Sequence, residues 1–178
     1  VLKEVLKLIR ASIPQNIEIK KYLQPDCGLV LADSAQLHQI GMNLITNAYH
    51  AVQDKGGEIN VEVREIEVDK EPNSLNLASG KYATLTVIDD GKGIPKEHID
   101  KIFEPYYTTK EQGKGTGLGL SVVYGIVKEH RGEISVTSEY DKGTSFRVYI
   151  PIMKQSITKV DNTKSAIFPK GSECILLV

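Results

Sequence analysis

Two glycine-rich stretches constrain this chain most, because each lies at a junction between predicted elements. DDGKGIP at residues 89–95 directly follows the apolar run 83–88, and GTGLGLS at 115–121 opens a segment with helical periodicity. The second stretch does not fit a dinucleotide-binding unit, because the strand–helix–strand layout and its ribose-binding acid are absent. It is not a Walker loop either, since no Gly-Lys-Ser/Thr follows. The chain must therefore place these loops in another architecture.

Hydrophobic periodicity predicts alternating strands and helices in one α/β domain. Asp33 or Ser34 can cap the longest helix, and the turn Asp141-Lys142-Gly143 joins the last two strands as a hairpin. The predicted helices cover residues 1–11, 35–53, 116–130 and, as one short turn, 96–102. The predicted strands cover residues 17–20, 29–32, 58–68, 81–89, 133–139 and 144–150. A polar surface loop is expected around residues 71–80.

Composition narrows the classes of function. The 178 residues suit one domain, and 22 basic against 23 acidic residues give a net charge of −1, so no basic field favours nucleic acid. No apolar run reaches the ~20 residues that span a bilayer, so we expect no membrane contact by this part of the protein. Cys27 and Cys174 are isolated, which favours a reduced, cytoplasmic setting. The chain does not begin with Met, so a fragment is expected, and any membrane anchor would lie elsewhere in its parent.

The first glycine-rich stretch places a carboxylate at the end of a strand predicted to be buried. Such a strand holds Asp89 rigidly, where it can accept a hydrogen bond from an adenine amino group. Gly91 and Gly93 let the backbone approach a ligand closely, because they carry no Cβ. A plain turn is the alternative, since Asp-Gly pairs are common turn formers.

The second glycine-rich stretch leads into a predicted helix. Gly115, Gly117 and Gly119 lie at its start, where free backbone N–H groups and the helix dipole attract phosphate. A glycine-rich connection without a ligand is the alternative. Both stretches together predict a nucleotide site.

Asn43, Asn47 and His50 recur at intervals of four and three residues, so they share one face of the predicted helix 35–53. Asparagine is a poor helix former, and this face is separate from the apolar stripe. An amide oxygen is a neutral ligand that suits Mg²⁺ beside phosphates, which makes Asn47 the candidate metal ligand. The alternative is a solvated polar face, and a surface position is expected for His50.

An aromatic segment lies between the two glycine-rich stretches. Phe103, Tyr106 and Tyr107 precede Lys110, and Lys114 follows. Either lysine could reach terminal phosphates as the segment closes and excludes water, with Lys110 preferred. The alternative is that both lysines are exposed loop charges.

Taken as whole motifs, the chain resembles the catalytic and ATP-binding domain of a sensor histidine kinase, from the superfamily of gyrase, chaperone, kinase and mismatch-repair ATPases. LHQIGMNLITNAYHAV resembles the N box of this family, and VIDDGKGIP resembles the G1 box. IFEPYYTTK is similar to the F box, GKGTGLGLS to the G2 box, and DKGTSF to the later glycine-threonine motif. In this order the motifs cover nearly all of residues 15–151.

The resemblance implies an α/β two-layer sandwich of the Bergerat type, with a mixed sheet against three helices and a mobile ATP lid at 94–114. It implies that Asp89 binds the adenine amino group and that Asn47 holds Mg²⁺. Asn43 and Lys110 are the implied catalytic residues. The other residues that it places at ATP are Gly91, Gly93, Ile94, Tyr107, Gly115, Thr116, Gly117, Leu118, Gly119, Leu120 and Thr144.

The resemblance also divides the chain. Residues 1–12 would end a dimerisation helix, 13–152 would be the catalytic and ATP-binding domain, and 153–172 a linker. Residues 173–178 resemble the truncated first strand of a receiver domain, as in a hybrid kinase; a terminal strand packed on the same domain is the alternative. The implied partners are ATP, a histidine-bearing dimerisation domain of the same protein, and a receiver domain or response regulator.

One position bears on the reaction. At the position of Asn43, ATPases of the superfamily carry a glutamate, and its carboxylate activates water for hydrolysis. The amide of Asn43 cannot take a proton, so it leaves water without a strong base. None of the four histidines lies in the sequence context of the family's phosphoacceptor, and His50 stands where many kinases have lysine. This fragment is therefore expected to bind ATP without phosphorylating itself. Steady phosphate release would favour an ATPase clamp instead, and failure to bind ATP would favour a non-catalytic interaction module.

Overall fold

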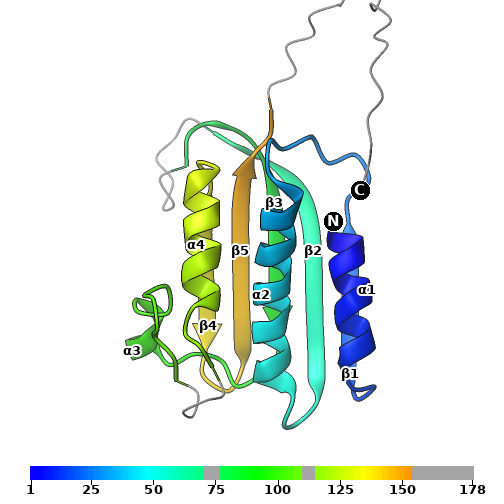
Figure 1. The fold of residues 1–178 in the computed structure, drawn as a ribbon, viewed down its shortest axis with the longest axis vertical. Helices are drawn as coiled ribbons and strands as arrows, with labels where there is room; N and C mark the ends of the chain where they lie inside the picture. The colour runs from blue at the N-terminus through cyan, green and yellow to red at the C-terminus, as the bar shows by residue number, and fades with distance from the viewer. Residues whose placement is uncertain (70–76, 110–114, 154–178) are drawn as a thin grey trace, which may run out of the picture.

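The computed structural model describes residues 1–69, 77–109 and 115–153. In these residues a five-stranded sheet carries a layer of helices on one face (Figure 1). The helices are α1 (Leu2–Ser12), α2 (Ser34–Val52), α3 (Lys96–Ile99) and α4 (Gly119–Glu129). The strands are β1 (Ile17–Leu23), β2 (Gly57–Val68), β3 (Gly80–Asp89), β4 (Glu133–Glu139) and β5 (Gly143–Pro151). The predicted α/β two-layer sandwich is confirmed.

The strand order is β1-β2-β3-β5-β4. β1 and β2 pair in parallel, so the chain must cross over between them, and α2 makes this crossover. The other neighbouring strands are antiparallel. In this register Asp89, the last residue of β3, lies opposite Ile59 of β2 and Thr144 of β5. A carboxylate therefore ends a central strand, flanked by backbone on both sides.

The apolar stripe of α2 forms the middle of the core. Its N-cap is Asp33, whose carboxylate accepts a hydrogen bond from the Ala35 N–H at 2.7 Å. The stripe consists of Ile40, Leu44, Ile45, Ala48 and Val52, all buried, and it belongs to one cluster with residues of α1, α4 and the sheet. Burying a large aliphatic side chain contributes about 1.5–3 kcal/mol. These contacts fix the rotation of α2 and so the direction of its polar face.

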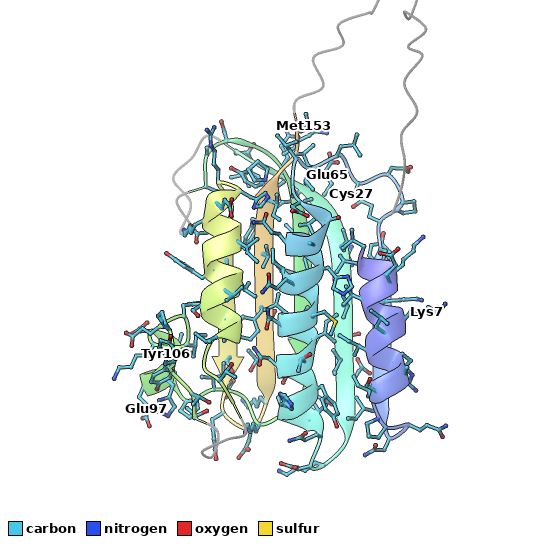
Figure 2. The ribbon with its side chains drawn as sticks, viewed as in Figure 1. Lys7, Cys27, Glu65, Glu97, Tyr106 and Met153 are labelled. Atoms are coloured by element: carbon cyan, nitrogen blue, oxygen red, sulfur yellow. The ribbon has the colours of Figure 1, made fainter. Side chains whose placement is uncertain are left out.

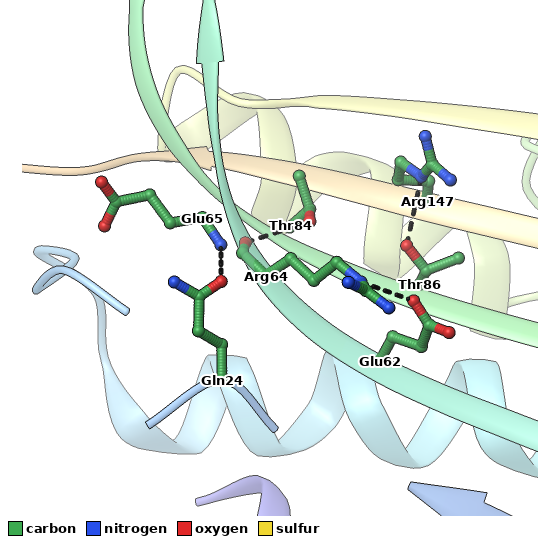
Figure 3. A network of polar contacts seen from close by, with 7 residues as sticks. All are labelled: Gln24, Glu62, Arg64, Glu65, Thr84, Thr86 and Arg147. Carbon is green, nitrogen blue, oxygen red and sulfur yellow. Dashed lines mark hydrogen bonds and ion pairs between the residues drawn. The ribbon is translucent and has the colours of Figure 1, made fainter. Parts of the chain in front are cut away.

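The face of the sheet away from the helices carries a network of polar contacts (Figure 3). There the Arg64 Nε donates to Glu62 at 2.8 Å, and the Thr84 hydroxyl donates to the Arg64 carbonyl at 3.1 Å. The Arg147 Nε donates to the Thr86 hydroxyl at 3.1 Å. The Thr84 and Arg147 bonds thus connect neighbouring strands, whereas the Arg64–Glu62 pair lies within β2.

Several predicted elements differ from those observed. The apolar run 29–32 is not a strand: it makes only an isolated bridge, from Val30 to Ile152, while Leu29 and Leu31 are 69% and 77% exposed. Leu8 of α1 is 56% exposed, although the helix buries Val5, Leu6 and Ile9. The helix predicted at 96–102 ends at Ile99, and α4 begins at Gly119, later than predicted.

Some predictions lie outside the described residues. These are most of the 71–80 loop, the linker after residue 153, and the terminal strand 173–178. Within the described part of the chain, no helix is long and apolar enough to cross a membrane.

Candidate functional site

A cavity of about 450 Å³ opens between α2, the N-terminus of α4 and the end of β3. Its walls include twelve of the residues that the sequence predicted at the ligand. They are Asn43, Asn47, Asp89, Gly93, Ile94, Tyr107, Gly115, Thr116, Gly117, Gly119, Leu120 and Thr144. Gly91 and Leu118 are not among the lining residues, and Lys110 and Lys114 lie outside the described residues. The glycine stretches and the asparagine helix, distant in sequence, therefore meet at one cavity.

Asp89 forms the floor of this cavity. Its side chain is 5% exposed, and the Gly91 N–H donates to its Oδ1 at 3.0 Å. Burial raises the pKa of Asp89 from 3.8 to about 6, because desolvation outweighs the lowering by hydrogen bonds from the Gly91 and Thr144 backbones. The adjacent Asp90 points elsewhere, and its Oδ1 accepts a hydrogen bond from the Glu58 N–H at 2.7 Å. Asp90 thus bonds to the backbone of β2, and of the two neighbouring acids only Asp89 lines the cavity.

The polar face of α2 forms one wall. The Asn43 Nδ2 donates to the Gln39 carbonyl at 2.9 Å, one turn back along the helix. This bond leaves the amide oxygen directed at α4: a Cβ added to Gly119 would lie 2.9 Å from the Asn43 Oδ1. Asn47 lies one turn further along the same wall. Two neutral amide side chains therefore face the N-terminus of α4 across the cavity.

The loop after β3 is held against both layers. The Lys92 N–H donates to the Ala51 carbonyl of α2 at 3.3 Å, and the Asp141 N–H donates to the Lys92 carbonyl at 2.9 Å. Gly91, although outside the lining, is needed for this approach, because a Cβ there would lie 2.5 Å from the Ala51 carbonyl oxygen. Its contribution to the site is therefore the position of the loop.

The second glycine-rich stretch ends at the N-terminus of α4, where no side chain caps the helix. Gly119 and Leu120, the first two helical residues, line the cavity, so uncapped N–H groups lie at its wall. Gly117 has φ +67° and a Cβ there would lie 2.4 Å from the Tyr106 carbonyl carbon. The Tyr106 N–H in turn donates to the Gly117 carbonyl at 3.0 Å. This contact fixes the aromatic segment beside the helix N-terminus.

The aromatic segment is only partly in the site. Tyr107 lines the cavity, and its hydroxyl is 2.5 Å from the His98 Nδ1. Phe103 contacts Tyr124 of α4 with ring centroids 5.6 Å apart. Tyr106 is 76% exposed.

Sequence reasoning missed several wall residues. Thr46 and Ala51 lie beside Asn43 and Asn47 on α2, and helical spacing could have identified them. His50, for which a surface position was expected, lines the cavity and is partly buried. Ser138 was missed for a different reason. It lies behind the wall, where its hydroxyl is bonded to the Ile94 N–H and the Thr144 hydroxyl. The register of β4 against β5 accounts for the Thr144 contact, whereas Ile94 reaches Ser138 from the loop after β3.

A second cavity of about 220 Å³ lies near the opposite end, beside Cys27 (Figure 2). Its lining is almost entirely aliphatic, as at Leu37 and Ile40, with no converging polar groups. Only the larger cavity combines a buried acceptor, two amides and a free helix N-terminus. Among its described lining residues Asp89 is the only carboxylate. The amide wall, formed by Asn43 and Asn47, therefore has no carboxylate beside it that could act as a base toward water.

Comparisons with known proteins agree with this geometry. Residues 32–154 match the family model described as histidine kinase-, DNA gyrase B- and HSP90-like ATPase. The whole chain is 37% identical to 20% of the sensor kinase CckA of Brucella abortus, strain 2308. Over 88% of its length it is 35% identical to sporulation kinase C of Bacillus subtilis, strain 168, covering 33% of that protein. It thus spans a third or less of these two relatives.

A solved structure shares the fold. It is a nucleotide-free form of the catalytic domain of histidine kinase ThkA, with a TM-score of 0.66 and 29% identity. The match covers 85% of this chain and 90% of that domain.

Proposed function

This chain belongs to the family of histidine kinase-, DNA gyrase B- and HSP90-like ATPases, and on that premise we propose how its cavity holds and uses ATP. It is the ATP-binding catalytic domain of a sensor histidine kinase, with the fold of such domains.

The adenine end of the site is at Asp89. The buried carboxylate at the cavity floor accepts hydrogen bonds from two backbone N–H groups but remains costly, and the adenine amino group would be a further donor to it. Thr144 lies beside it on β5. This buried acceptor is the observation that carries the proposal.

The phosphate end is at the N-terminus of α4. Uncapped N–H groups at Gly119 and Leu120 meet a negative charge favourably, and the helix dipole adds to the attraction. Gly115, Thr116 and Gly117 extend this wall as backbone donors, and Leu118 precedes the first helical turn. On this proposal Gly93, Ile94 and Tyr107 enclose the nucleotide between the two ends.

The amides of α2 would hold a magnesium ion beside the phosphates. Mg²⁺ prefers oxygen ligands and accepts neutral ones when phosphates and waters complete its shell. Asn47 offers such an oxygen, and Asn43 lies one turn away, with its oxygen directed at the α4 terminus. The ion would neutralise charge on the terminal phosphates.

We propose phosphoryl transfer to histidine as the reaction of the longer protein, since the amide wall favours transfer over hydrolysis. Hydrolysis needs a base beside the attacking water, and Asn43 cannot take a proton. Asp89, the only carboxylate among the described lining residues, is assigned to the adenine end. The γ-phosphate therefore awaits a nucleophile from outside, which we propose is a histidine on a dimerisation domain of the same protein. Lys110 is proposed to reach the terminal phosphate, although it lies outside the described residues.

The longer protein would supply the remaining parts. We propose that 1–12 ends the dimerisation helix, that 13–152 is the catalytic domain, and that 153–172 links it to a receiver domain beginning at 173–178. The curated relatives are named as sensor or sporulation kinases, and each extends well beyond the matched region. A cytoplasmic location follows from the proposal, because ATP is supplied there.

The proposal is tested in two stages. First, calorimetry with ATP, with and without Mg²⁺, should show binding that strengthens with the metal; absence of binding in both conditions would leave a degenerate domain. Second, adding the histidine-bearing helices of the parent should yield an acid-labile phosphohistidine. Steady phosphate release by the fragment alone, without that product, would instead identify an ATPase.

A further inference from the structure

Ser138 of β4 connects three parts of the site from behind its wall. It shares a strand face with Ile134 and Val136, which pack in the core, so its hydroxyl points toward the helix layer. The Ile94 N–H donates to the Ser138 Oγ at 2.8 Å. The Gly143 carbonyl and the Thr144 Oγ1 each lie 2.9 Å from the same Oγ. Ser138 therefore contacts the loop after β3, the turn before β5 and a cavity side chain.

Counting protons assigns a direction to each bond. A serine hydroxyl has one hydrogen and two lone pairs. The Ile94 N–H uses one lone pair, and the Gly143 carbonyl can only accept, so the serine hydrogen goes to Gly143. The remaining lone pair then faces Thr144, which must donate its own hydrogen to Ser138. The Thr144 oxygen is left with lone pairs, and no hydrogen, for the cavity.

This assignment makes the inner end of the cavity an acceptor surface. Thr144 and Asp89 are partners in the pairing of β5 with β3, and both line the cavity. A carboxylate and a hydroxyl oxygen that presents lone pairs favour a ligand edge that donates hydrogen bonds. An exocyclic amine on the base can donate to these two oxygens. A purine with a carbonyl at the same position would instead place a hydrogen-bond acceptor against the acceptors of Asp89 and Thr144.

We propose that Ser138 is a positioning residue for base selectivity: it fixes Thr144 as an acceptor, so that the site prefers a 6-amino purine to a 6-oxo purine. This inference rests on the proposed placement of adenine at Asp89. Ser138 itself acts through Thr144 and is not among the residues that line the cavity. Without the Ser138 oxygen, the Thr144 hydroxyl is free to turn its hydrogen into the cavity and donate to a carbonyl.

The measurement is the ratio of ATP affinity to ITP affinity, by calorimetry with Mg²⁺. ITP carries the 6-oxo purine and the same phosphates, so the ratio isolates the base end from the rest of the site. Ser138→Ala should lower this ratio by roughly five- to tenfold. Ser138→Thr keeps the hydroxyl and suits a strand, so it should preserve the ratio. Ser135→Ala, on the opposite face of the same strand, is the matched control and should leave the ratio unchanged.

A double-mutant cycle separates positioning from general packing. Thr144→Val removes the hydroxyl at similar volume, and adding Ser138→Ala to it should change the ratio no further. Additive effects of the two substitutions would overturn the proposal. So would a Ser138→Ala protein with a lower melting temperature and an unchanged ratio. If Ser138→Ala does not fold, Ser138→Cys replaces it, since a thiol fills the space but bonds weakly; an unchanged ratio there also refutes the role. Failure of the wild type to bind ATP would instead refute the proposed function.

Discussion

Replacing Asp89 with a neutral residue should remove a pH-dependent loss of folding stability that this buried carboxylate causes in the absence of nucleotide. The side chain is 5% exposed, and its pKa is raised from 3.8 to about 6 by burial. Between these two values the folded chain holds the proton more tightly than the unfolded chain does. The free energy of unfolding therefore falls as pH rises through this window, and the cost is fully present above about pH 7.

The size of the effect follows from the two pKa values. For a pKa of about 6 in the folded state and 3.8 in the unfolded state, ionisation of Asp89 removes about 2 kcal/mol of stability from about pH 4.5 to about pH 7.5. Asp89→Asn cannot ionise and lacks this slope. The amide loses one of the backbone hydrogen bonds that the carboxylate accepts, which lowers stability by a similar amount at every pH. The difference between the two proteins should thus change by about 2 kcal/mol in the variant's favour over this range.

Urea denaturation of the nucleotide-free chain at several pH values measures this difference. Asp26→Asn provides the control, because Asp26 is an exposed carboxylate and its loss should not reproduce the change with pH. The same Asp89→Asn protein should bind ATP at least about tenfold more weakly, since a charged acceptor is lost. A stability difference that stays constant with pH would refute the argument from burial, and unchanged ATP affinity would refute the assignment of Asp89 to adenine.

Three further substitutions test other parts of the site. Asn47→Ala should abolish the strengthening of ATP binding by Mg²⁺ while leaving metal-free binding nearly unchanged; calorimetry in both conditions decides this. Gly117→Ala should destabilise the fold by about 1–2 kcal/mol or more, because φ is +67° and the new Cβ would meet the Tyr106 backbone at 2.4 Å. Gly125→Ala, in the same region of the chain but with nothing within 4 Å of the new Cβ, should stabilise α4 by about 0.5–1 kcal/mol. Equal effects of the two alanines on the urea midpoint would contradict this reading of the backbone.

The parts of the fold that the sequence predicted well are those set by local patterns. The periodicity of α2, its cap at Asp33 and the hairpin at Asp141–Gly143 depend on residues close in sequence, and all three are observed. The run 29–32 shows the limit of this reasoning. Its apolar residues favoured a strand, but pairing depends on what lies beside it, and only Val30 finds a partner.

The residues of the site likewise differ in whether local sequence could identify them. Asp89, Asn43 and Asn47 were identified because each combines an unusual residue type with a definite position on a strand or helix. Ser138 could not be identified, since Ile94 lies 44 residues upstream in the loop after β3, and Thr144 becomes its neighbour only through the register of β4 against β5. Local sequence thus indicates which side chains face the cavity, while the groups that orient them depend on tertiary pairing.

The two faces of α2 make the fold and the site inseparable. One face buries Ile40, Leu44 and Val52, and the other presents Asn43 and Asn47 to the cavity. Inserting one residue between them would turn everything downstream by about 100°, sending amides into the core and aliphatic groups into the cavity. Length changes inside this helix are therefore intolerable, whatever residue is added. Descendants of this chain can vary the helix by substitution alone.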